Sequence, residues 1–389
     1  MKTPKLLSPL VAVGLFYWLV VRRREAASGL VDPIQLVDPD PHTDKLCDPF
    51  AEPGFLHYDA ENPLGTRWIP YSESCEPAPD WLGFLTQKDT NRLSFLKDRT
   101  ILILGDSVDR NALHHFAEML GLPRYCVPYD DFSQKGVVPT GWDDRGIPWV
   151  IEVPWLGLTL TNGFFYGVDD EDNFKQQPDW HAPGKAEDRI DQLFKVHTAQ
   201  LPQEPSFISL HSGLWDLAFF GRQDRAWQES SEAPLSNERV RFWVKRAAQI
   251  LEHTRKTWPG TPVWYRKLHR VGPVDQASYD FRHDGKAEAA PEKFSNFFTN
   301  VRTHQLREMM DAVAIARGAP VFDFGGLFEG WQRHQTGAHP DKYPAGPLYI
   351  SALIHHVYME QIGREKWRLS HQRDLFPVTG FNNSAPVSA

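Results

Sequence analysis

Short apolar runs alternate with helical patterns along most of the chain, and this alternation constrains the fold more than any other feature. The runs lie at 100–104, 158–161, 207–210, 262–265 and 321–324. Apolar residues at helical spacing predict helices at 111–120, 240–254, 301–313 and 348–360. Strands that are apolar on both faces belong to parallel sheets with helices on either side. The pattern therefore predicts an α/β protein built on a parallel sheet.

In such sheets, ligands bind beyond the carboxyl ends of the strands, so the residues that follow each run are candidates for a site. The first run continues as Gly105-Asp106-Ser107 and then a helix. A serine on a tight turn at a helix N-terminus is exposed, and the free backbone N–H groups there can stabilise an oxyanion. Ser107 is therefore a candidate nucleophile, and the alternative is an ordinary N-cap. The chain contains no G-x-S-x-G nucleophile elbow.

Two later runs also end in polar residues. The third run leads to Gly213, which can bring a backbone N–H close to a substrate, and to Trp215 and Asp216. Trp215 is interpreted as a stacking platform for substrate or as a core residue. The fourth run ends in a basic cluster that includes Arg266 and His269, interpreted as an anion or hydrogen-bonding site or as a solvated loop.

A serine nucleophile needs an imidazole within hydrogen-bond reach. His339 follows the last run in a loop on the expected side of the sheet, and Asp341 lies two residues later. His355 and His356 fall inside the last predicted helix and are expected to be packing or surface residues. His334 and His339 lack partners at metal-ligand spacing, so we expect no metal and no bound cofactor.

The N-terminus reads as a membrane anchor. Residues 6–21 contain no charge and are followed by three arginines, a poor context for signal cleavage. We predict a signal anchor over residues 1–25, and a cleaved signal peptide or a buried helix are the alternatives. Beyond it we expect a linker rich in Asp and Pro at 26–45, an irregular lobe without its own core at 46–98, a catalytic domain at 99–363 and a tail at 364–389.

Charge and cysteine content exclude several classes of protein. The net charge is −8, and the first 25 residues carry five basic side chains and one acidic, so the body is still more acidic. Nucleic acid is therefore not an expected partner, because nonspecific binding to it requires cationic surface. Three cysteines exclude a disulfide-dense scaffold. Cys47 and Cys75 flank the irregular lobe and form the expected bridge, which leaves Cys126 free.

Four sequence blocks together resemble the SGNH/GDSL superfamily, and within it the PC-esterase group of polysaccharide O-acetyltransferases. They are GDSVDRN (105–111), SGLWD (212–216), RKLHR (266–270) and HP (339–340). The resemblance implies a flavodoxin-like three-layer sandwich, a Golgi or other secretory-pathway membrane with the body in the lumen, and a glycan acceptor. It makes Ser107 the nucleophile and His339 the base. Gly213 would line the oxyanion hole, and Arg110 and Asn111 would hold the site.

The chain departs from this pattern at two positions. The family places an aspartate three residues before the histidine, where this chain has Thr336. Asp341 is the nearest substitute acid, and a Ser–His dyad or an impaired site are the alternatives. His211 stands where an asparagine often lies near the oxyanion.

Three functions are open at this point. The first is a glycan O-acetyltransferase that acts through an acyl-serine, with an unknown donor such as acetyl-coenzyme A. The second is a carbohydrate acetyl-esterase, and the third is a non-catalytic glycan-binding protein.

Overall fold

The computed structural model describes residues 47–128, 131–137, 147–168, 183, 185–227, 233–271, 298–336 and 338–363. The expected anchor, linker and C-terminal tail lie outside these residues. The described residues from Cys47 onward form one compact unit. Among the described residues, no helix combines the length and apolar character needed to cross a membrane.

The described core is a mixed sheet of eight strands, and the predicted strands form its parallel half. In spatial order the strands are β10 (Val321–Phe322), β9 (Val263–Arg266), β8 (Pro205–Leu210), β3 (Thr100–Gly105), β7 (Leu158–Phe164), β6 (Trp149–Val153), β4 (Tyr125–Cys126) and β5 (Gly136–Val137). The pairs from β10 to β7 are parallel, whereas β6, β4 and β5 pair antiparallel. The prediction of an α/β fold with a parallel sheet is confirmed for this half. The antiparallel edge was not predicted.

The parallel strands follow the order 2-1-3-4-5, which is the order of flavodoxin-like sheets. Among these parallel strands, the first along the chain is β3, and it lies between the second, β7, and the third, β8. The direction of winding therefore reverses between β3 and β8. Crevices for ligands open at such switch points, so the turns after these two strands are where a site is expected.

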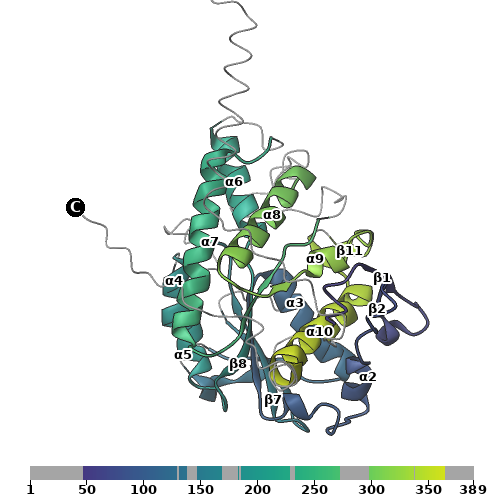
Figure 1. The fold of residues 1–389 in the computed structure, drawn as a ribbon. Coiled ribbons are helices and arrows are strands. Elements are labelled where there is room, and N and C mark those ends of the chain that lie inside the picture. The colour runs from purple at the N-terminus through teal and green to yellow at the C-terminus, as the bar shows by residue number, and fades with distance from the viewer. Residues whose placement is uncertain are drawn as a thin grey trace, which may run out of the picture. The chain divides into compact units, whose positions relative to one another are not determined.

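Helices cover the sheet on both sides (Figure 1). One group contains α3 (Ser107–Leu120), α10 (Lys342–Tyr358) and α2 (Trp81–Thr86), which pack together. The other group contains α4 (Ala186–Arg189), α5 (Lys195–Thr198), α7 (Asn237–Thr257) and α8 (Asn300–Ala316), with α6 (Leu214–Ala226) beside them. Two short elements, α9 (Phe324–Leu327) and the hairpin of β11 (Gln335–Thr336) and β12 (His339–Pro340), connect β10 to α10.

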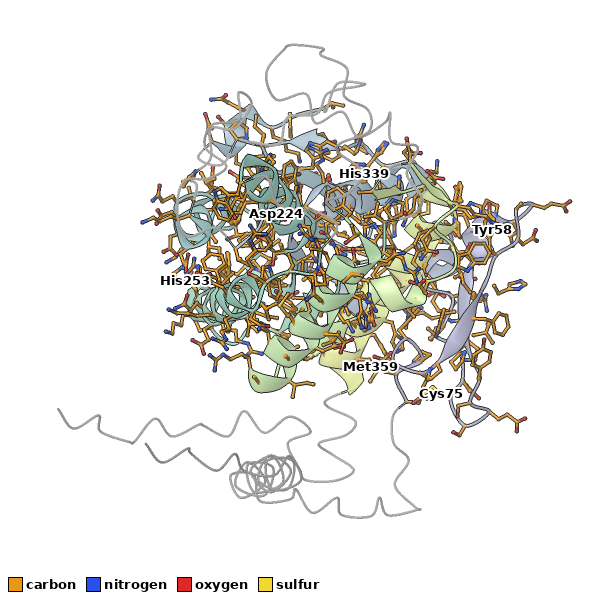
Figure 2. All side chains as sticks on the ribbon, turned by 90° about the horizontal axis from the view of Figure 1, so that it is seen from above. Tyr58, Cys75, Asp224, His253, His339 and Met359 are labelled. Carbon is orange, nitrogen blue, oxygen red and sulfur yellow. A yellow bond between two sulfur atoms is a disulfide. The ribbon has the colours of Figure 1, made fainter. Side chains whose placement is uncertain are left out.

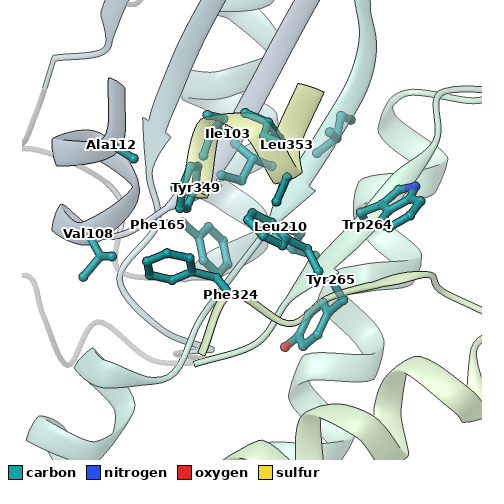
Figure 3. Close-up of a cluster of buried hydrophobic side chains, with 14 of the residues drawn as sticks. Ile103, Val108, Ala112, Phe165, Leu210, Trp264, Tyr265, Phe324, Tyr349 and Leu353 are labelled. Carbon is teal, nitrogen blue, oxygen red and sulfur yellow. The ribbon is translucent and has the colours of Figure 1, made fainter. Parts of the chain in front are cut away.

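The core lies between the sheet and these helices. Every residue of β3 is buried. Figure 3 shows Ile103 and Leu210 of neighbouring strands in one cluster with Tyr349 and Leu353 of α10. The helices approach closely where residues are small, since a Cβ added at Gly346 of α10 would lie 3.1 Å from the Cβ of His115 on α3.

Residues 47–98 contain short regular elements. β1 (Gly54–His57) and β2 (Arg67–Pro70) form a hairpin, and α2 follows. Their apolar side chains, among them Leu56 and Trp81, belong to the same core cluster as the sheet. The expected bridge between Cys47 and Cys75 is confirmed, with a Cα–Cα distance of 5.6 Å, and Cys126 is free.

Candidate active site

The turn from β3 into α3 is built around two aspartates. Asp106 is the N-cap of α3, and its Oδ1 accepts a hydrogen bond from the Val108 N–H at 2.9 Å. Asp109 reaches back, and its Oδ2 accepts from the Asp106 N–H at 3.1 Å. A Cβ at position 105 would lie 2.0 Å from Asp109 Oδ2, which explains Gly105. Since Asp106 caps the helix, Ser107 is the first helical residue and its hydroxyl is not used as a cap.

Ser107 and His339 lie side by side although 232 residues separate them. Ser107 Oγ is 2.7 Å from His339 Nε2. His339 belongs to β12, whose pairing with β11 fixes the loop after the last parallel strand. His339 lies well apart from the disulfide at Cys75 (Figure 2). The distance is short enough for the serine hydroxyl to donate to the imidazole, which is the contact that activates a serine nucleophile.

His269 holds the loop that carries His339. Its Nε2 lies 2.7 Å from the carbonyl oxygen of Ala338, the residue before His339. Burial, together with the nearby Arg266 charge, lowers the pKa of His269 to about 3. The ring is therefore neutral at physiological pH, and its single N–H donates to that carbonyl.

A buried charge network lies beneath the nucleophile turn. The guanidinium of Arg266 contacts both oxygens of Asp109, with Nε 2.5 Å from Oδ1 and Nη2 2.7 Å from Oδ2. The Tyr349 hydroxyl donates to Asp109 Oδ1 at 2.7 Å. All three side chains are almost completely buried. Burial and the Asp109 charge raise the pKa of Tyr349 well above its ordinary value, so it remains a donor.

His211 links this network to the helix cap. Its Nε2 lies 3.3 Å from Asp106 Oδ2, and its Nδ1 lies 3.0 Å from the Arg266 carbonyl oxygen. Burial alone would raise the pKa of Asp106, but the charges of His211 and Arg266 and the Val108 N–H hold it well below its ordinary value. Asp106 is therefore ionised, and His211 fixes the turn after β8 against the turn after β3.

Asp106, Asp109 and His211 also form the one group of potential metal ligands in the described residues, with ligand atoms within 4.8 Å of one another. Both oxygens of Asp109 face the Arg266 guanidinium, Asp106 Oδ1 accepts from the Val108 N–H, and Asp106 Oδ2 lies 3.3 Å from His211 Nε2. A cation would have to displace a buried guanidinium, so the group fits a structural network better than a metal site.

The structure does not bring Asp341 onto His339. Asp341 precedes α10, and its Oδ1 accepts a hydrogen bond from Thr336 Oγ1 at 3.0 Å. Within the described residues there is no ion pair between Asp341 and His339. The physical reason is the hairpin: Thr336 pairs with His339 across it, and the Asp341 side chain turns toward Thr336.

Gly213, Trp215 and Asp216, which follow β8, differ in their backbone conformation and in their surroundings. Gly213 has a φ of 145°, which a residue with a side chain rarely adopts. Trp215 is 5% exposed and packs with Phe164 and Tyr166, so it offers no open face and the prediction of a stacking platform is corrected. Asp216 is also buried, and it accepts from Trp243 Nε1 at 2.9 Å. It supports the core and does not face Ser107.

Arg110 and Asn111 lie one turn along α3 from Ser107. Arg110 is buried, with its guanidinium 4.9 Å from the ring centre of Trp149 and 5.4 Å from that of Phe164. Asn111 is half-buried and shares the helix face of Ser107 at i+4 spacing. Both therefore lie next to the nucleophile along α3, and their role in holding the site stays a prediction.

The sequence analysis missed Asp109 and Tyr349. An acidic residue three positions after an N-cap is the signature of a capping box, which would have identified Asp109. Tyr349 lies inside an apolar helix and gave no such signal.

His355 and His356 are buried, and both Nε2 atoms lie 3.7 Å from the carboxylate of Asp48. Burial lowers the pKa of His355 to about 4 and raises that of Asp48 to about 6. They lie on the α10 side of the core against Phe50 and Trp264, so they are packing residues outside the site.

Comparisons with known proteins found no matching family model and no matching curated protein. Several solved structures align over most of their own length. The aryl esterase of M. smegmatis is 13% identical with a TM-score of 0.35, and the alignment covers 67% of this chain and 99% of that one. A carbohydrate acetylesterase from Sinorhizobium meliloti is 11% identical over 67% and 99% of the chains, also with a TM-score of 0.35. A peptidoglycan O-acetylesterase is 8% identical over 71% and 96%, with a TM-score of 0.33. Scores this low do not establish a relationship.

Proposed function

We propose that this protein is a serine acyltransferase of the SGNH type that moves acetyl groups onto glycan hydroxyls. The contact that supports this function best is the 2.7 Å approach of Ser107 Oγ to His339 Nε2 at the switch point of the sheet. A non-catalytic protein has no need to keep a serine and an imidazole in this geometry at a helix N-terminus.

In the first half of the reaction, Ser107 Oγ attacks the carbonyl carbon of an acetyl ester. His339 Nε2 takes the hydroxyl proton as the Oγ–C bond forms. The ester C–O bond then breaks, and the proton passes from His339 to the leaving group. In the second half, His339 accepts the proton of a sugar hydroxyl as its oxygen bonds to the acetyl carbon of the acetyl-enzyme. The Oγ–C bond then breaks, and the proton passes from His339 to Ser107 Oγ.

The charge that develops on the carbonyl oxygen needs N–H donors. The Ser107 N–H belongs to the first turn of α3, where N–H groups have no acceptor within the helix. The turn after β8 carries Gly213 and is held against the same corner by the contact between His211 and Asp106. We therefore assign the oxyanion hole to the backbone N–H groups of Ser107 and Gly213.

The glycan acceptor and the secretory location rest on the sequence resemblance. The bridge between Cys47 and Cys75 supports this location, because disulfides persist in oxidising compartments. The membrane contact through the N-terminal residues and the identity of the acyl donor belong to the same proposal. Water in place of the sugar hydroxyl would make the same site an acetyl-esterase.

The experiment that tests this function is acetylation of the full chain with p-nitrophenyl acetate, with and without polysaccharide acceptors. Intact mass, peptide mapping and released acetate are measured together. We expect an acetyl adduct on Ser107 that a glycan discharges faster than water does. Equal discharge with and without glycan would identify an esterase. An adduct that persists in Ser107→Ala would refute the assignment of the nucleophile.

A further inference from the structure

Beyond Ser107, the same face of α3 leads to a group of basic side chains around a buried indole. His114 lies seven residues after Ser107, which is on the order of 10 Å along the helix. Its ring centre is 6.5 Å from that of Trp149. The guanidinium of Arg124 lies over the same indole at 4.9 Å. This group is therefore within the reach of a substrate whose reacting end is at Ser107.

The indole of Trp149 is a fixed platform. Its ring is 3% exposed, and its backbone is held on both sides. The Trp149 N–H donates to Asn162 Oδ1 at 2.8 Å, and its carbonyl accepts from Thr161 Oγ1 at 2.9 Å. A guanidinium stacked on such a ring keeps the N–H groups at its edge free to bind a planar anion.

None of the residues that the structure describes uses those groups of Arg124. Among the described residues its half-buried guanidinium makes no hydrogen bond and no ion pair within 4 Å. The nearby carboxylate of Glu118 forms its ion pairs with other residues. One of its oxygens lies 3.2 Å from His114 Nε2 and the other lies 3.2 Å from Lys342 Nζ.

Two buried nitrogens beside Arg124 also lack partners. Neither Trp149 Nε1 nor His114 Nδ1 has a hydrogen-bond partner in the described part of the chain. Buried polar atoms of this kind normally find one, so their grouping indicates a place where an external polar group binds. Burial lowers the pKa of His114, and the charges of Arg124, Lys342 and Arg110 act in the same direction against the Glu118 carboxylate, so more cations than anions act on this ring.

We propose that Arg124, on the Trp149 platform and beside His114, binds a carboxylate of the acceptor, so that glycans with a uronate near the acetylated hydroxyl are preferred. This inference rests on the proposed function. One unpaired guanidinium matches one carboxylate in charge and in planar geometry. The phosphates of coenzyme A carry several charges and would need more unpaired cations than the described residues supply here.

The test compares two oligosaccharides that differ in one group, a glucuronate carboxylate or the same carbon reduced to a primary alcohol. Transfer to each from p-nitrophenyl acetate gives a ratio of kcat/KM values with the full chain. We expect the native ratio to favour the acidic acceptor about tenfold, as one charge-assisted hydrogen bond supplies. In Arg124→Gln the ratio should fall close to one, and in native protein it should fall as salt is raised.

The matched control is Arg92→Gln. The Arg92 guanidinium also lies over an aromatic ring, 4.6 Å from the centre of Phe84, but it belongs to the segment after α2. This variant should keep both the ratio and the rate with the neutral acceptor. A native ratio near one, or a ratio unchanged in Arg124→Gln, overturns the proposal.

A binding measurement separates this inference from the proposed function. Calorimetric titration of Ser107→Ala with the acidic oligosaccharide needs no turnover, and adding Arg124→Gln should weaken binding about tenfold. If Ser107 is never acylated but this loss is observed, the function fails and the subsite stands. If Arg124→Gln slows acylation by acetyl-coenzyme A and leaves acceptor binding unchanged, the anion belongs to the donor and the proposal is overturned.

Discussion

Replacing Asp109 by asparagine tests whether the buried charge network holds the nucleophile turn. The two side chains have nearly the same shape, so the change leaves no cavity. It removes the charge that faces the Arg266 guanidinium at 2.5 and 2.7 Å. Arg266 is then left charged at 0% exposure. Breaking a buried pair in this way costs about 3–5 kcal/mol of unfolding free energy.

The contrast with a surface pair makes this magnitude decisive. Glu252 lies 3.0 Å from Arg317, and both side chains are more than 40% exposed. Glu252→Gln should therefore cost less than about 1 kcal/mol. Removing the orphaned charge as well, in Asp109→Asn with Arg266→Met, should recover part of the loss, because an uncharged pair carries no desolvation penalty.

Urea unfolding of the full chain, followed by tryptophan fluorescence, measures all four proteins. Acylation of Ser107 by p-nitrophenyl acetate reports on the turn itself. In Asp109→Asn it should slow as well, because the Asp106 N–H loses a charged acceptor. A loss no larger than that of Glu252→Gln, or a double variant no more stable than Asp109→Asn, would refute the reasoning.

Three further predictions concern the site and the packed histidines. His339→Ala should slow acylation as much as Ser107→Ala, and the double variant should be no slower, because residues that act as one unit are not additive; a much slower double variant contradicts the pairing. Asp341→Asn should change turnover little, whereas loss of a triad carboxylate costs about 10⁴-fold, and steady-state hydrolysis of p-nitrophenyl acetate measures it. Burial lowers the pKa of His355 to about 4, so the unfolded chain binds more protons below pH 6.5 and stability rises with pH from about 4 to 6.5. Asp48, with its pKa raised to about 6, opposes this between about pH 4 and 6. His355→Phe should therefore remove this contribution. Between pH 4 and 6.5, the free energy of unfolding should rise by roughly 3 kcal/mol less than in the native protein.

The parallel half of the sheet could be predicted because burial on both faces leaves a visible signature. The run at 100–104 is apolar after Thr100, and β3 is buried throughout. Within the antiparallel edge, β6 is also largely apolar and buried, but its run was not interpreted as a strand, and the two outer strands have no such run. β4 and β5 are two residues long, and their residues are half-buried or exposed. Short edge strands depend on their neighbours for pairing, so no local pattern identifies them.

The position of Ser107 could also be predicted, because strand, turn and helix are adjacent in sequence. The place of His339 required only the rule that parallel strands end at one edge of the sheet. The role of Trp215 could not be predicted, because a tryptophan at this position can either stack on a substrate or pack in the core. Its partners Phe164 and Tyr166 come from the end of β7 and the residues after it, and only the fold brings them there.

The support of the nucleophile turn shows where sequence reasoning stops. Asp106 and Asp109 are three residues apart, and a local rule connects them to the start of α3. Asp109 is also held by Arg266 and Tyr349, which lie 157 and 240 residues away. The Asp109 carboxylate therefore binds a backbone N–H at the start of α3, the buried Arg266 and the Tyr349 hydroxyl at once. It joins the turn after β3 to β9 and to α10. A residue with so many contacts tolerates little change, and the cause of that intolerance lies in partners that its own neighbourhood in the sequence does not reveal.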